Sequence, residues 1–261
     1  ERRLEHGNRH CRLVVQQAAQ RIFAGAQFDA GDVAQARHGD QLVPEEHPGQ
    51  RLYFAVIPKN VDDYLGALSQ YREQADTDAA KQLAPWFIHQ GNPPSEDVPV
   101  SFSMLLNLVS AANTGDPKVL WGFLSRYAPG ATPEKNPILA ELVGYAIAYY
   151  RDFVLPEKKH RAPTDPERKA LEDLVAALEK LPKDATAESI QNEVYEIGKA
   201  NGFTNLRDWF KAMYETLFGQ AQGPRMGSFI ALYGVKETIA LVRRALAGEL
   251  AAAPAAGGKS A

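Results

Sequence analysis

The stretch GQAQGPRMGSFIALYG, which runs from Gly219 to Gly234, decides the fold because its glycines and its proline divide a helical pattern into short pieces. Gly219 ends one helix, Gly223-Pro224 opens another, and Gly234 ends that one, since glycine terminates helices and proline suits their first turn. With Gly223 as the N-cap, Arg225 lies in the first turn of the new helix. The free backbone N–H groups and the positive dipole end at that point favour an anion.

Helical patterns flank this stretch on both sides and extend back to residue 51. Their starts carry N-cap and proline signals at Asp116-Pro117, Thr186, Asn205 and the capping box Thr164–Glu167. No segment alternates convincingly between apolar and polar residues, so the sequence predicts an all-α fold, a helical bundle or cage of about eight helices. The expected helices cover residues 100–113, 117–128, 137–155, 165–181, 187–201, 206–218, 224–233 and 235–250.

Length, charge and cysteine content restrict the class of protein. The chain has 261 residues, a formal net charge of −3 and a single cysteine, Cys11, which excludes an internal disulfide and fits a reducing cytoplasm. No apolar run reaches the roughly 20 residues that span a bilayer, and the first residues lack a signal-peptide core, so we expect no membrane partner. The net negative charge argues against a protein that binds DNA or RNA non-specifically along its length. It is compatible with a local basic patch that binds one RNA of defined shape.

The composition changes abruptly near residue 50. Residues 1–50 lack lysine, tyrosine and tryptophan and contain four of the six histidines, whereas all thirteen lysines follow them. We therefore expect residues 1–50 to be a poorly ordered or non-native extension. Two helical regions, 51–135 and 136–250, follow it, and the small-residue tail 251–261 is expected to be disordered.

Motifs of catalysis are absent from the sequence. It contains no glycine-rich phosphate loop, no metal-type spacing of histidine and cysteine, and no G-x-S-x-G nucleophile turn. His89 follows an apolar Trp-Phe-Ile run and is expected to be structural. We therefore predict no catalytic residue and no metal ligand in this chain.

The opening stretch is part of a longer resemblance. TLFGQAQGPRMGSFIALYGVKETIALVRRAL, residues 216–246, resembles the end of the anticodon-binding region of class I lysyl-tRNA synthetases, and a looser version closes the related glutamyl-tRNA synthetases. The resemblance extends in order through the segments 198–203, 206–211, 142–150, 120–123, 99–110 and 51–59. It therefore covers about residues 51–250, with 51–135 as a helical connecting region and 136–250 as the anticodon-binding domain.

The resemblance implies ATP-dependent attachment of lysine to its tRNA in the cytoplasm. In the family a Rossmann-type domain with His-Ile-Gly-His-like and Lys-Met-Ser-Lys-Ser-like motifs performs this reaction, and neither motif occurs in this sequence. We therefore expect lysine tRNA and a missing catalytic domain as partners, no cofactor in this chain (ATP and lysine belong to the full-length family), and no activity from the chain alone. Residues 1–50 depart from the family pattern, which suggests a truncated or mis-framed gene start.

Contacts to RNA are predicted mainly in the C-terminal region. Anticodons are single-stranded loops that proteins read by stacking and by hydrogen bonds to base edges, and the planar fork of arginine suits both. Arg225 is the first candidate, with an ion pair that braces two helices as the alternative. Arg207, Lys211 and Arg243 add positive charge between residues 205 and 250, where six basic residues face four acidic ones.

Two further candidate sets have structural alternatives. Trp209 could stack a base, but its place in a helical apolar stripe favours the core. Lys158, Lys159 and Arg161 form a basic loop that could contact phosphates, and a solvated charge run is the alternative.

The alternative function is a non-catalytic helical protein–protein interaction module, which the apolar helices and modest acidity equally permit.

Overall fold

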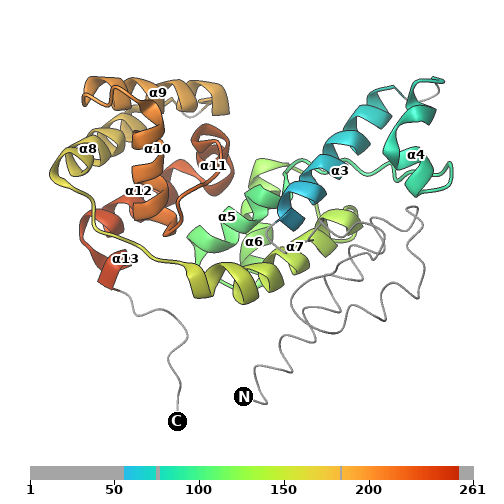
Figure 1. The fold of residues 1–261 in the computed structure, drawn as a ribbon, viewed down its shortest axis with the longest axis horizontal. Coiled ribbons are helices and arrows are strands. Elements are labelled where there is room, and N and C mark those ends of the chain that lie inside the picture. Colours follow the sequence, from blue (N-terminus) through green and yellow to red (C-terminus); the bar gives the residue numbers. More distant parts are fainter. Residues whose placement is uncertain (1–55, 75–76, 183, 253–261) are drawn as a thin grey trace, which may run out of the picture. The chain divides into compact units, whose positions relative to one another are not determined.

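The computed structural model describes residues 56–74, 77–182 and 184–252. Every regular element in these ranges is a helix, which confirms the predicted all-α fold (Figure 1). The described chain forms two compact units, one up to Ser103 and one from Met104. The extension predicted over residues 1–50 lies outside the described residues, as does the predicted tail from residue 253 onward.

The first unit contains α3 (Ile57–Glu73), a 3-10 turn (Ala80–Gln82), α4 (Ala84–Ile88) and the start of α5 (Phe102–Ala112). Asp62 on α3 accepts hydrogen bonds from the backbone N–H groups of Phe102 and Ser103, and so caps α5. The His89 ring lies 2.6 Å from the Tyr64 hydroxyl, which agrees with a structural role for this histidine.

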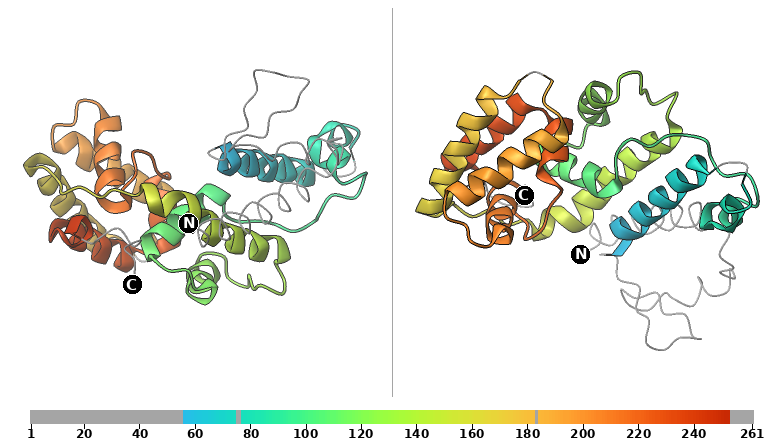
Figure 2. Two further views of the ribbon diagram at one scale, coloured as in Figure 1. Left: turned by 60° about the horizontal axis from the view of Figure 1, so that its bottom comes forward. Right: turned by 90° about the horizontal axis from the view of Figure 1, so that it is seen from above.

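The second unit contains the remaining helices. After α5 come α6 (Pro117–Tyr127) and α7 (Pro137–Tyr149), and α7 continues through a π turn (Tyr150–Val154) and a 3-10 turn (Leu155–Glu157). An extended linker then leads to α8, as both views of Figure 2 show. The C-terminal helices are α8 (Asp165–Lys180), α9 (Ala187–Ala200), α10 (Leu206–Met213) with its π extension (Tyr214–Phe218), α11 (Met226–Tyr233), α12 (Val235–Leu246) and α13 (Glu249–Ala252).

Four of the expected helix starts are confirmed by their caps. The side chains of Asp116, Thr186 and Asn205 each accept a hydrogen bond from a backbone N–H in the first turn of the helix that follows. Thr164 and Glu167 form the predicted capping box. These signals act within four residues of chain, so the sequence reveals them directly.

The boundaries of the last two expected helices are wrong. The short helix begins at Met226 instead of Pro224, so Arg225 is its N-cap. The last predicted helix is interrupted at Gly248, which has a φ of 77°, and α13 then runs to Ala252, within the range predicted as a disordered tail.

The core of the second unit joins α9 to α11 and α8 to α12. Trp209, Phe218 and Phe229 are its largest fully buried side chains. α11 packs closely against α9 at Gly227, because a Cβ there would lie 2.1 Å from the Ala187 carbonyl oxygen. No helix in the described part of the chain is long and apolar enough to cross a membrane.

Candidate nucleic-acid interface

The loop from Gly219 to Arg225 is held on the ring of Tyr214. Gly219 ends the π extension of α10 with a φ of 66°, a conformation that favours glycine. A Cβ at Gly223 would lie 2.4 Å from the Tyr214 ring, and the Tyr214 hydroxyl donates a hydrogen bond of 2.8 Å to the carbonyl of Pro224. These contacts keep the loop extended as far as Arg225, which explains why α11 begins later than predicted.

Arg225 is exposed at the end of this loop. No carboxylate of the residues that the structure describes forms an ion pair with it, so the bracing alternative finds no partner within those ranges. The expected set of free N–H groups is also smaller than predicted, because the Gly227 N–H already donates to the buried Gln191 side chain at 2.8 Å. What the site presents is therefore a guanidinium group.

One side of α10 carries both aromatic and basic side chains. Arg207, Phe210, Lys211 and Tyr214 recur at spacings of three and four residues, which places them on one face of the helix. The Phe210 ring centroid lies 6.3 Å from that of Tyr214 and 5.4 Å from that of Tyr195 on α9. We call Tyr195, Phe210 and Tyr214 the aromatic face.

Trp209 does not belong to this face. Its side chain is 0% exposed, and its ring N–H donates a hydrogen bond of 3.0 Å to the carbonyl of Val194. Both faces of the ring are covered by protein, so the predicted role in stacking a base is corrected. Trp209 is a core residue, which was the alternative for it.

Lys158 points into the protein. Its Nζ donates to the Ser110 carbonyl at 3.0 Å and to the Tyr150 hydroxyl at 3.3 Å. Burial, with a smaller effect from the positive charge of Arg244, lowers the pKa of Lys158 to about 8. The predicted phosphate contact is therefore corrected: this lysine ties the linker to α5 and to the π turn after α7.

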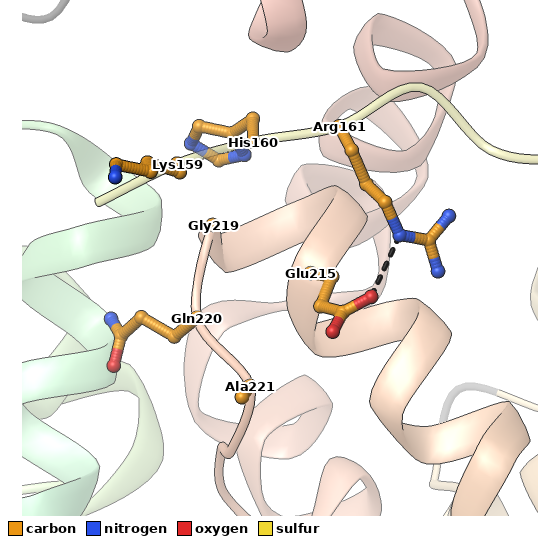
Figure 3. Close-up of a pocket in the computed structure, with 7 residues that line it drawn as sticks. All are labelled: Lys159, His160, Arg161, Glu215, Gly219, Gln220 and Ala221. Carbon is orange, nitrogen blue, oxygen red and sulfur yellow. Dashed lines mark hydrogen bonds and ion pairs between the residues drawn. The ribbon is translucent and has the colours of Figure 1, made fainter. Parts of the chain in front are cut away.

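The next linker residues border an open hollow of about 360 Å³ beside the start of the loop (Figure 3). The backbone N–H of Lys159 donates to the Gly219 carbonyl at 2.9 Å, while its side chain is exposed and, like Gln220, extends toward one side of the hollow. Arg161 instead pairs with Glu167 at 2.6 Å and with Glu215 at 2.7 Å. Lys159 is thus available to a ligand, whereas Arg161 braces the linker.

The remaining predicted cations lie on the surface. Arg207 is exposed and has no carboxylate partner among the residues that the structure describes. Lys211 forms a long ion pair of 3.7 Å with Glu215, and Arg243 pairs with Glu179 at 2.6 Å. Exposed pairs of this kind contribute about 0–1 kcal/mol, so Lys211 can exchange its partner for a phosphate at small cost. Arg243 links α12 to α8, and no contact places it beside the loop.

The sequence reasoning missed the aromatic face. None of the candidate residues named from the sequence is Tyr195, Phe210 or Tyr214. In the structure the buried stripe of α10 is Trp209, Ala212 and Met213, which leaves Phe210 at its edge. Within the described ranges no group of three or more His, Cys, Asp or Glu side chains could hold a metal ion.

Comparisons with known proteins agree with a site for RNA in this region. Residues 134–246 match the family model of the anticodon binding domain. The chain is 48% identical over 203 residues to a lysine–tRNA ligase of Roseobacter denitrificans, an alignment that covers 77% of this chain and 38% of that protein. It is 44% identical over 198 residues to the lysine–tRNA ligase of Rickettsia bellii, with 76% and 38% covered. The chain therefore spans well under half the length of these relatives.

Proposed function

We propose that this chain, which belongs to the family of lysine–tRNA ligases, is the tRNA-recognition part of such a ligase. Residues 134–246 match an anticodon-binding domain, and about three quarters of the chain is similar to lysine–tRNA ligases. The partner is lysine tRNA, bound at its anticodon loop. In the whole protein this part would hold the tRNA while lysine is attached with ATP, in a class I ligase that acts in the cytoplasm.

One observation carries this proposal: the matched domain contains a surface with the side chains that single-stranded RNA requires. Arg207, Arg225 and Lys159 are exposed and have no carboxylate partner within the described part of the chain, so their positive charge is available to phosphates. Phe210 of the aromatic face lies on the same helix as Arg207. Unpaired bases and their phosphates need both kinds of side chain.

The similarity to known proteins separates the proposal from a plain protein–protein module. Aromatic rings and arginines are also enriched in protein–protein interfaces, so the surface chemistry alone does not exclude such a module. The match to an anticodon-binding domain also falls on the residues that carry this surface. The similarity and the surface chemistry therefore point to the same ligand.

The proposal predicts that Arg225→Ala weakens binding of the 261-residue chain to lysine tRNA by about tenfold, since one arginine contact to RNA is worth about 1–3 kcal/mol. The measurement is a binding titration at two salt concentrations. The variant should also show a smaller loss of affinity with salt, because it releases fewer counterions.

Lys118→Ala is the matched control. Lys118 is an exposed cation on α6 without an ion pair in the described ranges, and its removal changes the net charge of the chain by the same amount. It should bind lysine tRNA as tightly as the unaltered chain does. An equal loss in both variants would show that only the net charge matters, and would contradict recognition at the loop.

A further inference from the structure

The aromatic face is an exposed set of rings for which the fold itself has limited use. Tyr195 is 36% exposed, and Phe210 and Tyr214 are half-buried. Tyr195 meets Phe210 edge-on, with 77° between the ring planes, while Phe210 and Tyr214 are tilted by 34°. The rings come from α9, α10 and the π turn, so three elements fix the arrangement before any ligand binds.

Tyr214 holds its ring in place through the loop. Its hydroxyl donates to the Pro224 carbonyl, and Gly223 packs directly against the ring. Burial raises the pKa of Tyr214 to about 12, so the phenol stays neutral and keeps donating at physiological pH. Arg225 follows Pro224 immediately, which places its backbone beside the aromatic face.

The charge beside the rings suits a nucleic acid. Arg207 and Lys211 lie on the face of α10 that carries Phe210 and Tyr214. The nearby Glu215 carboxylate is already engaged by Arg161 at 2.7 Å. Exposed rings bordered by available cations complement an unpaired base and its phosphate, because each base offers a flat π face and each phosphate a negative charge.

We propose that the aromatic face is a stacking platform for an unpaired base of the RNA loop, with Tyr195 as its most exposed ring and Arg225 beside the base. This inference rests on the proposed function and adds to it the place where a base is held. Arg207 and Lys211 then bind the phosphates that flank the stacked base. A protein loop docked on the same rings is the competing occupant.

The experiment uses lysine tRNA in which 2-aminopurine replaces each anticodon base in turn. The fluorescence of this base analogue falls when it stacks on an aromatic ring. With the unaltered chain, at least one anticodon position should show strong quenching on binding. Tyr195→Leu should lose that quenching and bind about tenfold more weakly, since stacking on one ring is worth about 1–3 kcal/mol.

Two variants serve as controls. Tyr195→Phe keeps the ring and should retain both the quenching and most of the affinity. Tyr127→Leu removes a tyrosine of nearly equal exposure, 37%, from the end of α6, and should bind lysine tRNA as the unaltered chain does. A thermal melt of each variant reports whether its fold is intact.

The outcomes distinguish the inference from the function on which it rests. Tight binding of lysine tRNA without quenching at any anticodon position would overturn the stacking platform and leave tRNA recognition standing. Unchanged binding and quenching in a folded Tyr195→Leu variant would also overturn the stacking platform and leave tRNA recognition standing. Failure of the unaltered chain to bind lysine tRNA would overturn both, and would favour a protein partner on these rings.

Discussion

Replacing Trp209 with alanine is expected to lower the free energy of unfolding by about 3–5 kcal/mol, the usual loss for a fully buried aromatic residue. Trp209 is 0% exposed, and its ring centroid lies 5.4 Å from that of Phe203. A Cβ on Gly198 would lie only 2.6 Å from the indole, so α9 and α10 are fitted closely around it. The truncation would leave a cavity between these two helices.

The measurement is urea denaturation followed by circular dichroism. Trp209→Phe is the matched comparison: it keeps most of the apolar volume and loses the hydrogen bond to the Val194 carbonyl, so its destabilisation should be about 1–3 kcal/mol. If Trp209→Ala were as stable as the unaltered chain, the tryptophan would not be a core residue, and its exclusion from RNA contact would fail.

Gly227→Ala should be nearly as damaging, with a loss of about 3 kcal/mol, because overpacking at a contact made by backbone atoms leaves little room for adjustment. The added methyl group would lie 2.1 Å from the Ala187 carbonyl oxygen and 2.8 Å from the Gln191 backbone nitrogen. The start of α11 must move away from α9. Since Arg225 immediately precedes that start, tRNA affinity should fall together with stability.

Gly122→Ala provides the control for this substitution. Gly122 lies on the exposed side of α6, and a Cβ there meets nothing within 4 Å. The same chemical change should therefore raise the free energy of unfolding by about 0.5–1 kcal/mol, the gain expected for alanine over glycine inside a helix. Equal stability of Gly227→Ala and the unaltered chain would show that α9 and α11 are not packed as closely as described.

Helix starts were predictable from the sequence where the signal is local. Asn205, Thr186 and the Thr164 capping box act on N–H groups two or three residues away, and all were predicted correctly. The start of α11 was not, because it depends on Tyr214 and Gln191, which hold the loop and Gly227 from elsewhere in the chain. The Gly-Pro pair itself does not indicate those contacts.

In the candidate site, too, features set by neighbouring residues were predictable and features set by distant residues were not. That Arg225 lies at an exposed helix start follows from Gly, Pro and the apolar run after them, although the predicted start, Pro224, is two residues before the observed one. The inward direction of Lys158 could not be inferred, because its acceptors are Ser110 and Tyr150. Likewise, the periodicity of α10 alone does not say which of Trp209 and Phe210 is at the edge, since that depends on how α9 packs against it.

The function proposed for this chain is recognition of the anticodon loop of lysine tRNA. The most direct measurement is the affinity of the unaltered 261-residue chain for lysine tRNA and for the same tRNA with its anticodon bases changed, in parallel at one salt concentration. We predict a preference of about tenfold or more for the unchanged anticodon, as expected when arginine and stacked bases read sequence. Equal affinity for both tRNAs would contradict recognition of the anticodon by this chain.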